Sequence, residues 1–253
     1  KKPFTLDALE EASRLAPQGP GNPVAWNADG TKFLYRQGRR WMVYDPSVRS
    51  SKELLDTTAL DAAAVKPASQ DPQPFEWENR RVRETPVQWT GNQILYSTGG
   101  DVFVIDGSSG KWTQLTKTAA RERDPKLSPD GKSIAFRRDW DLYTLEIASK
   151  RETRLTSGGS DLVRNGGLDW VYPEELDLGT AYWWSPDSKS IAYLQSDLTR
   201  EQIYPHEDLR GPRAIYEPQH YPQAGGNDPE VRVGVVAATG GKTHWWDAAS
   251  SAA

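Results

Sequence analysis

The sequence predicts an all-β fold, a β-propeller of four-stranded blades, of which about four are present. Hydrophobic residues make up only 36% of the 253 residues, whereas Trp, Gly and Pro are plentiful, and this composition favours many short strands joined by turns. A unit of strand, tight turn and three further strands also recurs along the chain. The second and third units begin about 38 residues apart, close to the roughly 40–45 residues of a propeller blade.

Each predicted unit opens with an apolar strand and a tight turn that contains Asp-Gly or a related pair. The first unit consists of two strands within 24–35, joined at Asp29-Gly30, followed by strands at 41–45 and 51–55. The second unit has strands at 87–89, 93–96, 101–106 and 111–116, and the third opens at 126–132 and continues through 133–136, 141–145 and 153–156. Alternating apolar residues in these strands should face the neighbouring blades.

The fourth unit opens at 183–189, and its later strands are displaced to 231–236 and 243–246. Larger gaps between units predict insertions at about 57–85, 157–180 and 197–229. Ahead of the repeats, Phe4 to Leu15 reads as a short amphipathic helix, followed by a Gly/Pro linker. The predicted organisation is therefore a helix and linker in residues 1–23 and a partial propeller in 24–253.

Charge and composition exclude several classes of partner. The net charge of −4 argues against nucleic acid and anionic membranes as partners. No run of residues approaches the roughly 20 apolar residues of a membrane span. The chain has no cysteine, which excludes disulfides and thiol catalysis but leaves the compartment open between a periplasmic or secreted location and the cytoplasm.

One stretch interrupts the repeat just before the fourth unit. It runs from Leu168 to Leu176 and reads Leu-Asp-Trp-Val-Tyr-Pro-Glu-Glu-Leu. Pro173 fixes its own φ and lacks an amide proton, which suits the first position of a short helix. Glu174 and Glu175 would then lie in the first turn, where the macrodipole favours negative charge and where acidic residues need no ligand.

Two adjacent carboxylates can also act as a receptor for a cation, because like charges this close favour the arrival of a positive group. A protonated peptide amine, with a pKa of about 8, is such a cation. At about 4 Å and an effective dielectric near 20, each carboxylate would attract it with roughly 4 kcal/mol before desolvation. A metal is disfavoured because no His, Asp or Cys cluster nearby would complete a coordination shell, and no organic cofactor is expected.

The sequence around the two glutamates resembles the propeller domain of the dipeptidyl peptidase IV family. The members of this family are serine exopeptidases of the prolyl oligopeptidase group. The similarity is carried by Asp-Trp-Val-Tyr-Pro-Glu-Glu at 169–175, Tyr-Trp-Trp-Ser-Pro at 182–186 and Ile-Ala-Tyr-Leu-Gln at 191–195. It covers about 85–253, although His220 and Gln223 stand where the family has basic residues. The resemblance implies that Glu174 and Glu175 grip the free N-terminus of a peptide, and that the propeller has eight blades.

The resemblance also implies an arginine that binds a substrate carbonyl. In some branches of the family it lies on an Arg-rich segment before the second blade, which the stretch 75–84 resembles, so that Arg81 and Arg83 are the candidates. The same stretch also fits a solvated helix face, because its acidic and basic residues are spaced at i,i+3 and i,i+4.

No catalytic residue is recognisable, because the chain lacks the Gly-x-Ser-x-Gly elbow of α/β-hydrolases. None of its three histidines has the surroundings of a triad, and His244 is predicted to pack within a blade. By resemblance, the Ser-Asp-His triad belongs to a C-terminal α/β-hydrolase domain, and the chain would select free N-termini for the release of dipeptides. Homodimers are expected as well. The alternative is a noncatalytic propeller that serves as a binding or interaction module.

Overall fold

The computed structural model describes residues 25–65, 87–209 and 212–246. The predicted helix at 4–15 and both candidate arginines, Arg81 and Arg83, lie outside the described residues. Within them the fold is almost entirely β, with two short helices, α2 (Thr58–Ala63) and α4 (Val171–Glu175). No helix in this part of the chain is long and apolar enough to cross a membrane.

Three four-stranded antiparallel sheets coincide with the first three predicted units, and within each sheet the strands neighbour one another in chain order. The first contains β1 (Ala25–Trp26), β2 (Phe33–Gln37), β3 (Arg40–Asp45) and β4 (Ser50–Asp56). The second contains β5 (Val87–Thr90), β6 (Gln93–Thr98), β7 (Asp101–Asp106) and β8 (Trp112–Gln114). The third contains β9 (Glu122–Leu127), β10 (Ser133–Arg138), β11 (Asp141–Glu146) and β12 (Glu152–Arg154). The predicted propeller fold is confirmed by this architecture.

The fourth sheet carries the predicted displaced strands and one more strand than a standard blade. Its strands are β13 (Val163–Asn165), β14 (Tyr182–Trp184), β15 (Ser190–Asp197), β18 (Glu230–Ala237) and β19 (His244–Trp245). Both β13 and β14 pair with β15, whose opposite edge pairs with β18. The prediction that His244 packs within the blade is wrong, because β19 is the outermost strand of the sheet and the His244 side chain is exposed.

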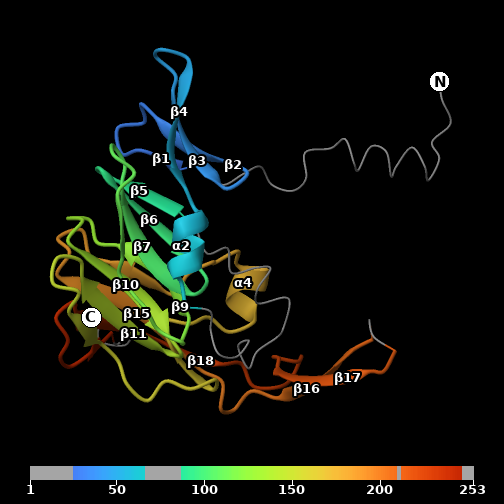
Figure 1. The fold of residues 1–253 in the computed structure, drawn as a ribbon. Coiled ribbons are helices and arrows are strands. Elements are labelled where there is room, and N and C mark those ends of the chain that lie inside the picture. Colours follow the sequence, from blue (N-terminus) through green and yellow to red (C-terminus); the bar gives the residue numbers. More distant parts are fainter. Residues whose placement is uncertain (1–24, 66–86, 210–211, 247–253) are drawn as a thin grey trace.

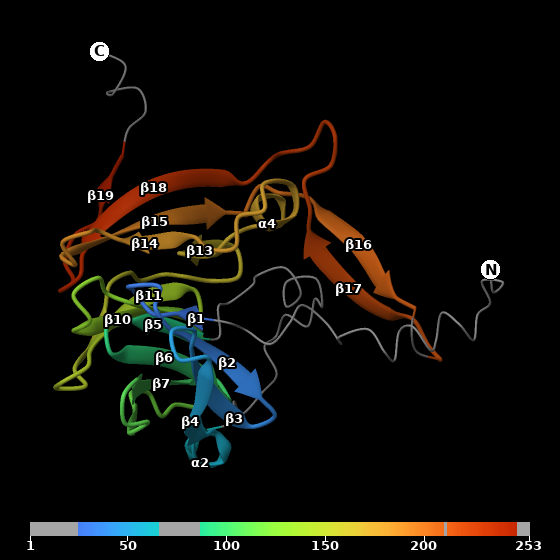
Figure 2. The same cartoon turned by 90° about the horizontal axis from the view of Figure 1, so that it is seen from above.

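The insertion predicted at 197–229 contains a β-hairpin. Its two strands, β16 (Ile203–Asp208) and β17 (Ile215–His220), pair only with each other among the described strands. Figures 1 and 2 show that the hairpin projects away from the sheets, while the four sheets follow one another in chain order. The base of this hairpin lies beside α4, where Tyr221 contacts Trp170.

The turns of successive blades are built by the same local chemistry. Ser128 donates to the Asp130 carboxylate at 2.6 Å and accepts the Ser133 amide at 3.0 Å. Ser185 repeats both bonds, to Asp187 and from Ser190, with the same distances. Such side-chain bonds satisfy turn amides that no strand partner reaches, which explains why Ser-Pro-Asp marks the start of a blade.

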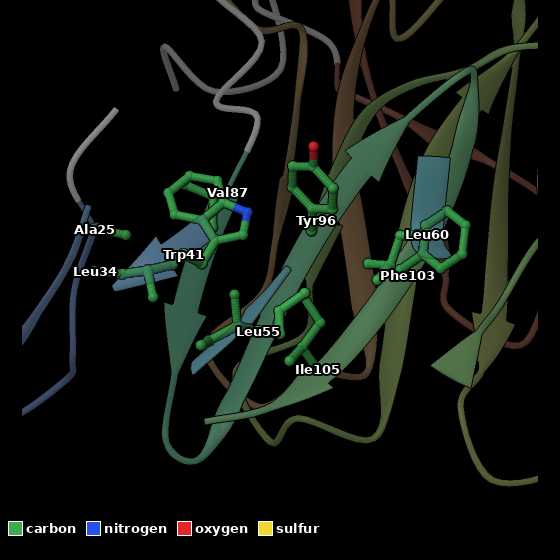
Figure 3. Close-up of a cluster of buried hydrophobic side chains, with 10 residues drawn as sticks. Ala25, Leu34, Trp41, Leu55, Leu60, Val87, Tyr96, Phe103 and Ile105 are labelled. Atoms are coloured by element: carbon green, nitrogen blue, oxygen red, sulfur yellow. The ribbon is translucent and has the colours of Figure 1, made fainter. Parts of the chain in front are cut away.

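The hydrophobic core lies between neighbouring sheets. Figure 3 shows the cluster between the first two, where Trp41 and Tyr96 meet edge to face with ring centroids 5.8 Å apart. Leu60 of α2 completes this cluster beside Phe103. Two further clusters join the second sheet to the third and the third to the fourth. Each blade is therefore stabilised mainly by apolar surface buried against its neighbours.

Candidate functional site

The two glutamates are carried by a loop that connects β13 to β14, two strands that both pair with β15. The backbone N–H of Gly166 donates to the carbonyl of Leu194 at 2.8 Å, and the Leu194 N–H donates to the carbonyl of Ala181 at 2.9 Å. Both ends of the segment 166–181, here called the double-glutamate loop, are thus fixed to one residue of β15. Gly166 has a φ of +68°, and a Cβ there would lie 2.6 Å from the Leu142 side chain. Only glycine fits this position without strain.

Helix α4 begins two residues earlier than the sequence indicates. It runs from Val171 to Glu175, so that Pro173 is its third residue and not its first. Proline is tolerated there because the first four amides of a helix have no intrahelical acceptor. The Asp169 carboxylate accepts the Tyr172 amide at 3.1 Å and so satisfies one of these donors. The Asp-Trp-Val-Tyr motif therefore contains the side chain, that of Asp169, which accepts an amide of the first helical turn.

The two glutamates of α4 differ in exposure. Glu174 is partly buried, with its Oε2 atom inside the protein, whereas the Glu175 side chain is exposed. Both residues therefore lie on the same short helix, as the sequence predicts, and the Glu175 side chain faces solvent.

The loop is supported from below by Arg164 of β13. Its guanidinium donates to the Leu168 carbonyl at 2.8 Å and to the Asp161 carbonyl at 2.9 Å. It also lies 4.4 Å from the ring centroid of Trp140. Ser196 of β15 adds a bond to the Gly167 carbonyl at 3.2 Å. Loop carbonyls are therefore held by a side chain that is itself packed and buried, which limits the movement of α4.

A small cavity of about 30 Å³ lies under the loop, bordered by Asp169, Pro173 and the third sheet. Arg123 and Arg137 line it, and burial, together with the charge of Arg137, lowers the pKa of Arg123 to about 10. Its volume is that of a water molecule and not that of a peptide. The cavity is therefore part of the support of the loop, with cationic groups beneath the acidic helix.

A second support comes from Lys126 of β9, which reaches the far end of the loop. Its ammonium group contacts Thr180, the Tyr182 carbonyl at 2.6 Å and the Asp124 carboxylate at 3.0 Å. Burial lowers the pKa of Lys126, and the neighbouring Asp124 charge opposes that effect. This cluster ties the returning end of the loop to the third sheet.

The base of the β16–β17 hairpin forms the remaining wall. Trp170 and Tyr221 meet edge to face with ring centroids 4.5 Å apart, and Tyr204 of β16 lies 5.7 Å from Tyr221. Glu201, just before β16, is 5% exposed. Burial, followed by the Asp169 charge, raises its pKa to about 7. Through Trp170 the loop therefore contacts Tyr221, which lies 51 positions further along the chain.

Sequence reasoning identified α4 but missed most of its surroundings. Arg164, Trp140 and Glu201 carry no motif, because a lone charged or aromatic residue in a strand or turn is usual in any propeller. Asp169 belongs to the motif at 169–175. Its role at the start of the helix could not be predicted, because the sequence places the first residue of α4 two positions too late. His220, one of three histidines, contacts the Glu201 carbonyl through Nδ1 at 3.3 Å.

Comparison with known proteins gives the family. The family model described as the dipeptidyl peptidase IV (DPP IV) N-terminal region matches residues 88–253. Dipeptidyl peptidase 4 of Sus scrofa is 25% identical over 224 residues, covering 84% of this chain and 28% of that protein. The "Probable dipeptidyl-aminopeptidase B" of Penicillium rubens is 35% identical over 250 residues, covering 91% and 26%. The chain thus spans about a quarter of the length of these curated relatives.

A solved structure shares the fold. The crystal structure of Porphyromonas gingivalis dipeptidyl peptidase 4 matches with a TM-score of 0.72 and 19% identity, covering 98% of this chain and 35% of that one. At this identity the likeness shows the fold alone, and it agrees with the four-stranded sheets described above. Because the family model covers well over half of the sequence, the chain belongs to the dipeptidyl peptidase IV family, to its N-terminal β-propeller region.

Proposed function

We propose that this chain is the substrate-selecting propeller of a dipeptidyl-peptidase-IV-like serine exopeptidase. Glu174 and Glu175 bind the α-ammonium group of a peptide, and the distance from them to the scissile bond limits the product to a dipeptide. The observation that carries the proposal is the position of both carboxylates on α4, a short helix on a loop fixed at both ends to β15.

The physical support is electrostatic and geometric. Two carboxylates on adjacent helical residues repel each other, and an ammonium group between them removes that repulsion. Charge-assisted hydrogen bonds of this kind contribute about 1.5–3 kcal/mol each. Because α4 is held by Asp169 and Arg164, little ordering of the protein is required when a peptide binds.

The remaining partners follow from the resemblance and belong to the same proposal. Arg81 or Arg83 binds a carbonyl of the peptide. A C-terminal α/β-hydrolase domain supplies the serine nucleophile with its Asp and His, and the protein acts as a homodimer. No metal or organic cofactor takes part.

The test is a binding measurement in the full-length protein with a peptide whose N-terminus is either free or acetylated. Glu174→Gln and Glu175→Gln should each weaken binding of the free-amine peptide by about 10–100-fold, the equivalent of one charge-assisted bond. Binding of the acetylated peptide should be weak in every variant. Isothermal titration calorimetry gives both affinities directly.

Asp177→Asn is the matched control. Asp177 is exposed and lies two residues beyond α4, so this variant removes one negative charge from the same surface without touching either glutamate. Its φ of +51° is one that asparagine adopts readily. Unchanged affinity in both glutamate variants would overturn the proposal. Equal affinity for free and acetylated peptides would favour a noncatalytic binding module instead.

A further inference from the structure

Three buried carboxylate oxygens beside α4 have no hydrogen-bond donor among the described residues. They are Oδ2 of Asp169 and both side-chain oxygens of Glu201. The two side chains are 1% and 5% exposed. An ionised carboxylate that is buried without donors is costly, and two such groups near each other add mutual repulsion.

The charged groups around Glu201 come from four elements and do not neutralise it. Asp169 precedes α4, and Asp228 precedes β18; both add negative charge. Arg164 of β13 adds positive charge, but its guanidinium donates to the Leu168 and Asp161 carbonyls and to the Asp161 carboxylate. His220 of β17 faces the backbone carbonyl of Glu201 through its ring nitrogen. One bound proton is the simplest way to balance this cluster.

We propose that Glu201 is a positioning residue for the double-glutamate loop, and that its buried carboxyl group carries a proton, so that Glu201 and Asp169 hold one negative charge between them instead of two. The neutral carboxyl group lets the base of the β16–β17 hairpin stay packed against the residues that precede α4. It acts together with the contact between Trp170 and Tyr221, which brings the same two segments together.

The titration of both groups agrees with this arrangement. Burial, followed by the charges of Asp169 and Asp228, raises the pKa of Glu201 from its ordinary 4.5 to about 7 against the opposing effect of Arg164. Burial also raises the pKa of Asp169, although hydrogen bonds from the Tyr172 and Val171 amides oppose it. The pair therefore holds one proton up to about neutral pH.

Loss of that proton places two negative charges in one buried cluster. Asp169 also holds the Tyr172 amide, so repulsion between Asp169 and Glu201 disturbs the first turn of α4. The inference rests on the proposed function, because Glu174 and Glu175 bind the peptide N-terminus only while α4 is held in place. Affinity for a free N-terminus should therefore fall above neutral pH for a reason separate from deprotonation of the peptide amine.

The experiment compares the wild type with Glu201→Gln in the full-length protein from pH 6 to pH 8. Glutamine has the same shape as a protonated glutamate and stays neutral at every pH. The probe is the dipeptide Ala-Pro with a free amine, and amine deprotonation cancels in the ratio of the two affinities. The dissociation constants should be equal at pH 6, and that of the wild type should be about tenfold higher at pH 8, as expected for a displaced binding group.

Hydrogen–deuterium exchange of the peptide spanning 168–178 provides a readout that needs no ligand. At pH 8 the wild type should exchange faster than Glu201→Gln, and at pH 6 the two should match. Glu201→Ala should bind Ala-Pro weakly at both pH values, with rescue by glutamine. Glu207→Gln, which changes an exposed carboxylate on β16, should behave as the wild type.

The outcomes separate the two proposals. Equal exchange and equal affinity of the wild type and Glu201→Gln at pH 8 would overturn the role of Glu201. If no variant distinguishes Ala-Pro from its N-acetylated form, the function proposed for Glu174 and Glu175 fails, and the exchange comparison still decides whether Glu201 positions the loop. A variant of Glu201 that does not fold leaves the glutamine variant and its pH profile as the deciding measurement.

Discussion

Asp141 shows how much a single buried carboxylate can organise in this fold. It lies at the start of β11 and accepts hydrogen bonds from Thr156 at 2.7 Å, from Asn165 at 2.9 Å and from Arg154 at 2.5 Å. Asn165 belongs to the fourth sheet, so the cluster joins two blades. Asp101 in the second sheet has a similar arrangement, since the Thr116 hydroxyl lies 3.4 Å from the Asp101 carboxylate and 2.9 Å from the Glu122 carboxylate. The threonine that follows the last strand of the second and third sheets is thus explained by its carboxylate acceptor.

Asp141→Asn should destabilise the protein by about 2–4 kcal/mol at pH 7, because a buried acceptor of several bonds is lost. Burial alone would raise the pKa of Asp141, but hydrogen bonds from Thr156, Arg154 and Asn165 outweigh it and lower the pKa below 3.8. The stabilisation by the ionised group is therefore present above that value and is lost as the pH falls through the folded-state pKa.

Urea unfolding at pH 7 and pH 3 measures this effect. The destabilisation should shrink at the lower pH. Asp139→Asn, an exposed carboxylate two residues away, should leave stability unchanged within about 0.5 kcal/mol. A destabilisation of Asp141→Asn that is equal at both pH values would contradict the electrostatic explanation.

At the scale of the elements, the strands were predicted well and their exceptions have physical reasons. Period-2 patterns and Ser-Pro-Asp turns locate strands because both depend on local chemistry. The start of α4 was misplaced, since Pro173 suits several positions of a first turn. The β16–β17 hairpin was missed because its strands pair only with each other among the described strands, and few of their described side chains are buried in a way that would set a pattern.

Support of the candidate site was less predictable than the site itself. The two glutamates are recognisable because they are adjacent and lie in a motif rich in rare residues. The residues that hold their loop in place are scattered along the sequence. The segments that carry Asp169 and Glu201 are brought together by the contact between Trp170 and Tyr221, and no local sequence pattern encodes this long-range contact. The candidate arginines, Arg81 and Arg83, remain predictions, since they lie outside the described residues.

Gly166→Ala tests the attachment of the double-glutamate loop. The variant should lose about 2–4 kcal/mol of stability, since a left-handed alanine is strained and its Cβ would overlap Leu142. Gly30→Ala is the control, because Gly30 has the same φ of +68° but open space around the Cβ, and it should lose about 1 kcal/mol. Thermal unfolding compares them, and equal losses would show that the close approach to Leu142 is unimportant.

For the whole molecule, stability is shared between neighbouring sheets. The cluster between the second and third sheets takes Leu95 and Val102 from one and Ile134 and Phe136 from the other. Because each sheet contacts the next one in the chain, damage at one interface should spread to both blades that form it.

Phe136→Ala should cost about 3–5 kcal/mol, as is usual for a fully buried phenylalanine. Hydrogen exchange should show loss of protection in both the second and the third sheet, whose strands lie within 87–154. Val48→Ala, at a side chain that is 67% exposed, should stay within about 0.5 kcal/mol of the wild type. Loss of protection confined to the third sheet would argue that the blades unfold independently.

The attachment of the double-glutamate loop at Leu194 has a consequence for how such proteins can diversify. Its two ends are fixed side by side on β15, so residues between them can be inserted or deleted while the blade keeps its pairing. Doubling the length of a flexible loop costs only about 0.6 kcal/mol in closure entropy. The length of the loop, and with it the position of its acidic helix, can therefore change in evolution without a change in the strands of the blade.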